Sequence, residues 1–374
     1  MNREDPAAAK KRALGGRRKF PRYVPVLFGI AAFALVLEIL NICSSRFADG
    51  FNTTVGAVFR TVLAHMTSFL PFSLAEFLLY LVPFLIALIA VIAYRRHSDS
   101  WRELGRYFVC ILSFFSIFFS LFVFSFGAGY RTTPLPEKMG FETGKIGVEE
   151  LTETTKFFIE KMNTAADGVS FGEDGFAVMP YSLAEMNEKL LSAYDTVCSD
   201  YPFIQRMNSR VKPVLASRLM SYTHITGVYS YYTGEANLNT YFPDYTLPFT
   251  AAHELAHQRG IAREEEANFV AFLVTSASDD PYLQYSAWRN LFEYVASALA
   301  MADADAYREL YAAIDPRIVT ELRAYREFFK PFSGSAASAV SDKFNDTYLK
   351  FHGSEAGSGS YGLVVDLAVA YFKK

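Results

Sequence analysis

Cysteine is scarce in this sequence. Only Cys43, Cys110 and Cys198 occur among 374 residues, and because they are far apart they predict neither a disulfide framework nor a cysteine-based metal site. A strong excess of one charge is also missing, since the formal net charge is −3. Hydrophobic residues make up 51% of the chain, which excludes a disordered, collagen-like or disulfide-scaffold protein.

Long hydrophobic runs are concentrated in the first third of the chain. Residues 24–42 are interrupted only by Glu38 and Asn41, residues 77–94 carry no charge, and residues 107–127 combine serines with many phenylalanines. At about 1.5 Å per helical residue, runs of this length match a hydrocarbon core of about 30 Å. We therefore predict three membrane spans at these positions and disfavour the alternative of three buried core helices.

Lysine and arginine are unevenly distributed around the predicted spans. They are frequent in residues 1–23 and between the second and third spans, whereas the loop between the first two spans holds only Arg46 and Arg60. The positive-inside rule then predicts a basic cytoplasmic tail at 1–23, a three-span anchor at 24–127 and an outward-facing remainder. The first run is long and no convincing cleavage pattern closes it, so we expect it to stay as an anchor.

Charge separates the anchor from the remainder of the chain. Residues 1–126 carry 14 Lys and Arg against 7 Asp and Glu, whereas the later residues carry 22 against 32. The acidic remainder argues against nucleic acid as a partner, and the spans make the lipid bilayer an expected one. Between the first two spans, the amphipathic stretch TVGAVFRTVLAHMTSFL is predicted either to lie on the membrane surface or to pack under the outer domain.

The outer part is predicted to be a helical domain with a few strands. Residues 128–146 have the prolines and charges of a linker, and residues 147–374 form the domain. The spacing of apolar residues predicts helices over 148–162 and 182–197. Residues 222–245, rich in Tyr, Thr and Asn, favour short strands, and within them GEANLN is interpreted as an edge strand, with an internal strand as the alternative.

The segment HELAH carries the chemistry of this sequence. Residues four apart share one face of a helix, so His253 and His257 can bind one metal ion from the same side, while Glu254 reaches a metal-bound water. Zinc lowers the pKa of bound water, and the carboxylate accepts the proton when that water attacks a carbonyl. We expect this helix to begin with Thr250 as N-cap and to end at Gly260.

A third protein ligand is expected from the helix that follows, because catalytic zinc takes three protein ligands and leaves one position for water. Three glutamates open this helix, at Glu264, Glu265 and Glu266. Glu264 lies on the same face of this helix as Asn268 and several small residues, which allow a close approach to the first helix. This shared face favours Glu264 as the ligand and Asn268 as the residue that orients a ligating histidine. The other two glutamates stay open as alternatives, although each also suits a solvated first turn.

Several segments carry a family resemblance. They are TGEANLN, LPFTAAHELAHQRGIAREEEANFVAFL, PFSLAEFLLYL before the second span, and NDTYLK and SGSYGLVVDLAVAY near the C-terminus. Together they resemble the DUF3810 family of bacterial membrane proteins, a family of unknown function with zincin-like sequence. HExxH followed by E-x-x-A-N is also similar to the gluzincin metallopeptidases, in which the Glu of E-x-x-A-[DN] binds zinc. The resemblance implies a zincin-like domain, a bacterial cytoplasmic membrane as location, and Glu264 as a zinc ligand.

A group that stabilises the oxyanion is expected outside the motif. Gluzincin-type hydrolysis usually takes a Tyr, His or Arg from another segment for this purpose. Tyr361 in the SYG segment, Tyr232 and His224 are the candidates, and each also has a structural interpretation.

The sequence thus predicts a mainly α protein, with three N-terminal transmembrane helices followed by an extracytoplasmic α+β zincin-like metallopeptidase domain. The expected function is zinc-dependent hydrolysis of peptide bonds outside the cytoplasmic membrane, with one Zn²⁺ ion as cofactor and a peptide or protein as substrate. Two alternatives stay open. One is a non-catalytic zinc-binding membrane sensor or assembly factor, and the other is a hydrolase of cell-wall amides.

Overall fold

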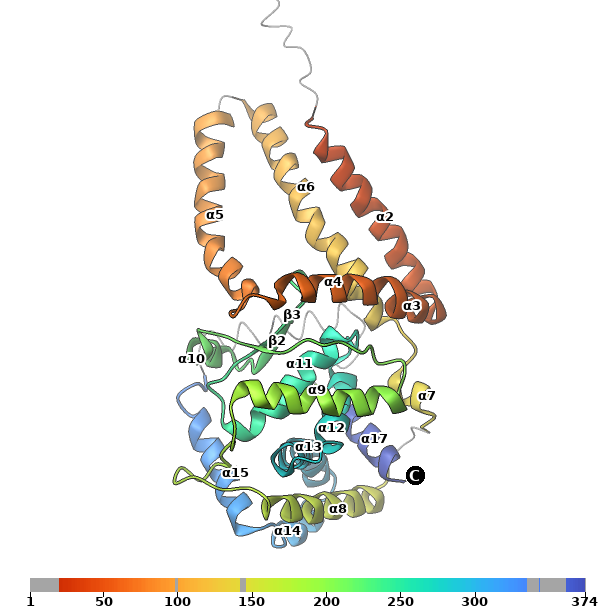
Figure 1. Ribbon diagram of the computed structural model, residues 1–374, viewed down its shortest axis with the longest axis vertical. Coiled ribbons are helices and arrows are strands. Elements are labelled where there is room, and N and C mark those ends of the chain that lie inside the picture. Colours follow the sequence, from red (N-terminus) through yellow and green to blue (C-terminus); the bar gives the residue numbers. More distant parts are fainter. Residues whose placement is uncertain (1–19, 98–99, 142–145, 335–342, 344–360, 374) are drawn as a thin grey trace, which may run out of the picture.

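The computed structural model describes residues 20–97, 100–141, 146–334, 343 and 361–373, and Figure 1 shows three long helices above a helical domain. The longer helices are α2 (Tyr23–Cys43), α4 (Ala57–Ser68), α5 (Leu74–His97), α6 (Trp101–Ser125), α8 (Val148–Ala166), α9 (Leu183–Asp200), α11 (Leu247–Gln258), α12 (Glu264–Ser276), α13 (Pro281–Ala302), α15 (Pro316–Phe329) and α17 (Tyr361–Phe372). Shorter helical segments are α3 (Ser45–Phe51), η1 (Asn52–Gly56), η2 (Gly127–Tyr130), α7 (Leu135–Met139), α10 (Ser217–Met220), η3 (Ser221–Thr223), η4 (Asp244–Thr246) and α14 (Ala304–Tyr311). The strands are β1 (Lys212–Pro213), β2 (Gly227–Ser230) and β3 (Glu235–Leu238).

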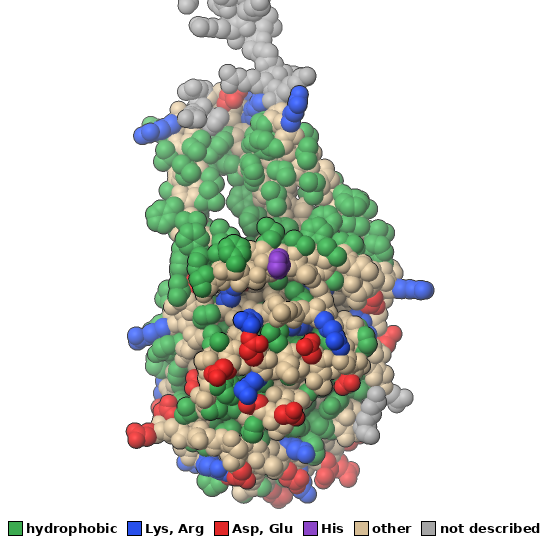
Figure 2. Space-filling view, viewed as in Figure 1, with side chains coloured by type: hydrophobic (Ala, Val, Ile, Leu, Met, Phe, Trp, Pro, Cys, Tyr) green, Lys and Arg blue, Asp and Glu red, His purple; other side chains and the backbone are tan. Residues whose placement is uncertain are grey.

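The three predicted spans are the helices α2, α5 and α6. Each is long and apolar enough to cross a membrane, so the chain is that of a membrane protein. Figure 2 shows that hydrophobic side chains dominate the visible surface of these helices, whereas charged side chains gather on the domain below and at the far end of the spans. This separation is the one expected when lipid surrounds one part of a chain and water surrounds the rest.

The ends of the spans follow from local capping. Helix α5 begins three residues before the predicted 77–94, because the N–H groups of Leu74 and Ala75 donate to the Glu235 carboxylate at 3.0 and 2.9 Å. Helix α6 begins at Trp101 instead of residue 107, because Ser100 Oγ caps its first turn. It ends at Ser125, two residues before the predicted end, whereas α2 matches its prediction to within one residue at each end.

Helix α4 lies across the base of the three spans, between them and the domain (Figure 1). Large apolar side chains on one side of it are exposed, among them Val58, Val62 and Met66. On its other side Arg60 and Ala64 are buried. The amphipathic stretch therefore packs on the domain with one face, which is one of the two predicted arrangements, and its other face exposes apolar side chains. Its position on a membrane surface stays a prediction.

Residues 128–146, predicted as a linker, are closely packed where the structure describes them. Leu135 is buried, and its N–H donates to Glu266 Oε1 at 2.8 Å. Arg263 donates to the carbonyl oxygens of Tyr130 and Thr132 at 3.1 and 2.6 Å. The end of the third span is thus joined to the start of α12, which belongs to the predicted site.

The domain core surrounds α13, which Figure 1 places between α8 and the pair α9 and α11. Four helices contribute one aromatic ring each to a cluster within it, with centroid separations of 5.0 to 6.0 Å; the rings belong to Phe158, Phe272, Trp288 and Phe372. Helices α8 and α9 contain most of the predicted 148–162 and 182–197 and run three to four residues further. Burial of these large rings stabilises the helices behind the site.

The small sheet has the strand order β1, β3, β2. Strand β3 pairs in parallel with β1 and antiparallel with β2, where Tyr229 faces Ala236. The interpretation of GEANLN as an edge strand is therefore wrong, because this segment forms the central strand and all four residues of β3 are buried. Its polar side chains form contacts inside the protein, since Glu235 pairs with Lys212 at 2.7 Å and Asn237 donates to the Val228 carbonyl at 3.1 Å.

Candidate metal centre

Helix α11 carries the HExxH segment. It begins at Leu247, so the predicted N-cap Thr250 lies inside the helix; Pro248 suits the first turn because its missing N–H is not needed there. The end at Gly260 is as predicted, since this glycine has φ +90 and the next N–H, of Ile261, bonds back to the carbonyl of Ala256 at 3.1 Å. The helix is thereby fixed at both ends around its two histidines.

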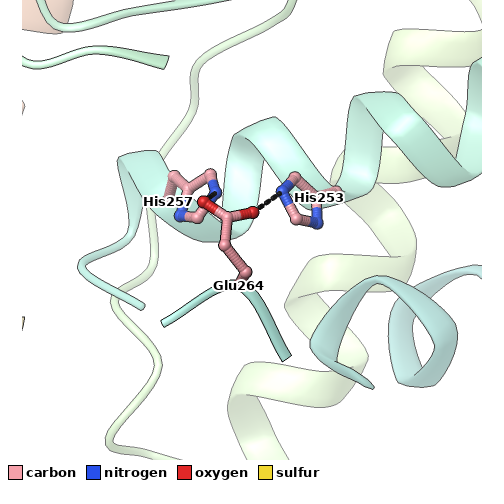
Figure 3. Close-up of side chains that lie close together, drawn as sticks. All are labelled: His253, His257 and Glu264. Carbon is pink, nitrogen blue, oxygen red and sulfur yellow. Dashed lines mark ion pairs between the residues drawn. The ribbon is translucent and has the colours of Figure 1, made fainter. Parts of the chain in front are cut away.

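The two histidines and one glutamate converge (Figure 3). His253 and His257 project from one face of α11, with ring centroids 4.5 Å apart and planes perpendicular. Glu264, the first residue of α12, reaches between them, with Oε2 3.2 Å from Nε2 of His253 and Oε1 3.5 Å from Nε2 of His257. One ligand atom from each residue lies within 4.8 Å of the other two. These three atoms can surround a single metal ion.

The glutamate triplet is resolved by its contacts. Glu264 is the glutamate that joins the two histidines. Glu266 is committed elsewhere, because its Oε1 accepts hydrogen bonds from the Leu135 N–H and from Arg263, both at 2.8 Å. Glu265 is outside the cluster, and burial raises the pKa of its carboxyl. Of the three glutamates, the position of α12 relative to α11 therefore brings Glu264 to the histidines.

The cluster has the electrostatics of a tight ion pair without a metal. Burial lowers the pKa of His257, but the Glu264 carboxylate outweighs burial and raises it to about 9. Burial raises the pKa of Glu264, and the two imidazoles outweigh this and hold it well below its usual range. Nδ1 of His257 lies 2.8 Å from the carbonyl oxygen of Ile261, a contact that keeps a proton on Nδ1 and leaves Nε2 on the side of Glu264.

The donor set fits a single divalent metal ion. Two imidazole nitrogens and one carboxylate are a common three-ligand set for zinc in hydrolases, and they leave a coordination position open. Among the residues that the structure describes, this group contains no fourth ligand. The carbonyl of Ile261 supplies the outer contact that usually fixes a ligating imidazole.

Glu254 lies beside this cluster and is only 4% exposed. Its Oε2 has no hydrogen-bond partner among the described residues. Burial raises the pKa of its carboxyl to about 6, although the two histidines and a backbone hydrogen bond with Tyr229 oppose the rise. A buried carboxyl with a pKa near neutrality and a free oxygen is suited to accept and return a proton.

No side-chain contact among the described residues joins Asn268, His224 or Tyr232 to the cluster. Asn268 is half-buried on α12; the orienting contact to His257 comes from Ile261, and Nδ1 of His253 has no partner among the described residues. Nε2 of His224 lies 3.1 Å from the Phe332 carbonyl. The ring of Tyr232 packs edge-on against Phe118 of α6 at 5.7 Å. Tyr361 begins α17, but its side chain lies outside the described part of the chain.

Two neighbours of the site were not predicted from the sequence. The ring of Phe126, directly after α6, packs edge-on against His257 at 5.9 Å. Gly227 in β2 lies against Glu254, because a Cβ atom there would come within 2.6 Å of Glu254 Cγ. No local pattern relates these residues to the HExxH helix, since both contacts depend on how distant segments pack.

One family matches most of the chain. The family described as "Protein of unknown function (DUF3810)" matches residues 51–369, a range that includes two of the three spans, α4 and the whole metal cluster. No curated protein and no solved structure matches the chain.

Proposed function

This chain belongs to the DUF3810 family, and we propose that it is a membrane-anchored zinc-dependent metallopeptidase. The observation that carries the proposal is the arrangement of four side chains. His253, His257 and Glu264 place one ligand atom each around a common point, and Glu254 lies buried beside them with an unpartnered oxygen. This combination is the one that metal-assisted hydrolysis of a carbonyl compound requires.

Each residue has a distinct role in the proposed reaction. A bound Zn²⁺ ion would lower the pKa of a water molecule to about 7 and polarise the carbonyl group under attack. Glu254 accepts a proton from that water and passes it to the leaving amine, for which a pKa near 6 is well matched. Ile261 holds the His257 ring through its carbonyl oxygen. The residue that stabilises the oxyanion stays a prediction, with Tyr361, Tyr232 and His224 as candidates.

Strand β2 supports a polypeptide as substrate. It is the outer strand of the described sheet on the side of α11, and Tyr229 in its middle bonds through its backbone to Glu254. An extended peptide that pairs with an outer strand presents its carbonyl groups in a regular row. Such pairing along β2 brings a peptide bond beside Glu254. The outer position that the sequence predicted for GEANLN therefore belongs to β2, and peptide pairing is proposed there.

The proposed location follows from charge. Basic residues cluster in 1–23 and at the adjoining ends of α5 and α6, which hold Arg95, Arg96, Arg102 and Arg106, so the positive-inside rule predicts that both regions are cytoplasmic. The domain that carries the metal cluster then lies outside a bacterial cytoplasmic membrane. The three-ligand geometry supports catalysis over a purely structural zinc site, which closes its coordination with four protein ligands.

The decisive test uses Glu254→Gln in the full-length protein in detergent or vesicles. We expect this variant to keep one zinc ion per chain and to lose cleavage of a peptide library, because only the proton acceptor is removed. Glu265→Gln is the matched control and should retain both properties. A peptide library that the wild type and Glu254→Gln cleave equally would overturn the proposal. Cleavage of cell-wall amides in place of peptides would move the same chemistry to the alternative substrate.

A further inference from the structure

The turn between β2 and β3 lies against a membrane span. The ring of Tyr232 contacts Phe118 with a centroid separation of 5.7 Å, and the ring of Tyr231 contacts Phe122 at 5.4 Å. Ser125 Oγ donates to the Tyr231 carbonyl at 3.4 Å. Phe118 precedes the end of α6 by seven residues, about 10 Å along a helix. The turn therefore reaches the level of the last two turns of the span.

The metal cluster is close to the same boundary. The ring of Phe126, the first residue after α6, contacts His257. Asn52, in the segment that joins α2 to α5 along the chain, donates from Nδ2 to the Gly260 carbonyl at 3.0 Å. A Cβ atom at Gly129 would come within 2.8 Å of both Ala262 and Gly260, so η2 also packs closely on the end of the HExxH helix. Helix α11 thus packs against the segments that directly adjoin the spans.

Strand β2 connects these two places. It passes Glu254 at Gly227 and leads through Ser230 to the turn beside α6. The strand has four residues, which at about 3.3 Å each span roughly 13 Å. Val228 on it is 43% exposed. Figure 2 also shows an opening between α5 and the neighbouring spans, on the membrane side of α4. A polypeptide paired with β2 therefore has one end beside the metal cluster and the other directed at the bilayer.

We propose that the substrates are themselves membrane-anchored polypeptides, cleaved within roughly five residues of the bilayer surface. This inference rests on the proposed peptidase function. The anchor of the substrate lies in the bilayer beside α6, and the extended segment that leaves the membrane pairs with β2. Confinement of both molecules to one membrane raises the effective concentration of that segment, so weak strand pairing suffices for binding.

The test compares anchored and free substrates in the same vesicles. Full-length protein is reconstituted in vesicles of phosphatidylethanolamine and phosphatidylglycerol. One substrate is a single transmembrane helix that continues into a randomised 20-residue segment, and the other is that segment alone. We expect the anchored form to be cleaved at least tenfold faster, with cuts concentrated in the first five to six residues after the helix.

Each outcome is decisive. Equal or faster cleavage of the free segment, or cuts spread evenly along the anchored one, overturns membrane anchoring as the substrate requirement while leaving the peptidase proposal in place. If neither substrate is cleaved faster than by Glu254→Gln, the peptidase proposal fails, and the inference fails with it.

A substitution in α6 tests separately whether the substrate reaches the metal cluster past the turn between β2 and β3. Phe118→Ala removes the ring that packs on Tyr232 without touching the metal cluster. We expect it to reduce the preference for the anchored substrate and to leave cleavage of the free segment unchanged. Phe119→Ala, an exposed neighbour on the same helix, is the matched control and should keep the preference. If both variants keep the same preference for the anchored substrate, the substrate does not reach the metal cluster past the turn beside α6.

Discussion

Gly227 lies directly against Glu254. A Cβ atom at position 227 would be 2.6 Å from both Cγ and Oε1 of Glu254, much closer than any real side-chain contact. The backbone of the next residue but one, Tyr229, bonds to the same carboxylate. Strand β2 therefore determines where the proposed proton acceptor stands, although the two segments are separate in the sequence.

Gly227→Ala is predicted to displace Glu254 and to lower peptide cleavage by about 100-fold, because catalysis is sensitive to shifts of about 1 Å in a reacting group. Zinc content should stay at one ion per chain, since the ligands are not touched. Initial rates and metal analysis of the purified variant check this. Gly50→Ala, at a position with no neighbour within 4 Å, is the control. Wild-type rates for Gly227→Ala would contradict the positioning role of β2.

Glu264→Gln and His253→Ala are each predicted to weaken zinc binding by at least 100-fold, because each removes one of three ligands from the same point. Competition titration with a chromogenic chelator measures this affinity. Glu265→Gln changes a neighbouring glutamate outside the cluster and should bind zinc like the wild type. Retention of full affinity by Glu264→Gln, with loss in Glu265→Gln, would reassign the ligand.

Zinc affinity is predicted to rise with pH between about 6.5 and 9. The pKa of His257 without metal is about 9, so the ring is protonated throughout this window and the metal must displace that proton. The pKa of Glu264 lies below its usual range, so this carboxyl stays ionised throughout the window and does not change the pH dependence of zinc affinity. The apparent affinity should therefore increase by up to tenfold per pH unit and level off near pH 9. Chelator competition at several pH values, with release of a proton on binding, checks the sign.

Arg60→Ala is predicted to destabilise the protein by about 3 kcal/mol, because Arg60 is 1% exposed and its loss leaves buried acceptors without donors. Its guanidinium donates at 2.8 Å to the side-chain and backbone oxygens of Asn52 and to the Ser125 carbonyl, and at 3.0 Å to Gln205. Thermal unfolding in detergent should show a Tm lower by about 4 °C. Arg46→Ala, at an exposed position in α3, should leave the Tm unchanged.

The histidine pair was predictable because its geometry is local. Residues four apart on a helix share a face whatever surrounds them, so His253 and His257 had to lie together once the segment was helical. The choice among the three glutamates was different. The helix face that Glu264 shares with Asn268 favoured Glu264, but its contact with the two histidines depends on where α12 begins. The hydrogen bonds from Arg263 to Tyr130 and from Leu135 to Glu266 help to fix that start.

The strand arrangement was predicted incorrectly because alternation of polar residues does not report what surrounds a strand. Glu235 and Asn237 in GEANLN suggested an edge facing water. In the structure Glu235 caps the first turn of α5 and pairs with Lys212, and Asn237 bonds to β2. Those partners lie up to 161 residues away in the sequence, so local composition could not identify them.

The sequence by itself determined the properties that depend on a short stretch of chain. The three spans follow from the length and apolarity of their runs, and the histidine pair follows from helical spacing. Only the tertiary structure decided which glutamate meets the histidines, that β2 borders Glu254, and that β2 lies next to the end of α6. The physical reason is that hydrogen bonds and packing between distant segments fix these relationships, and periodicity along the chain carries no record of them.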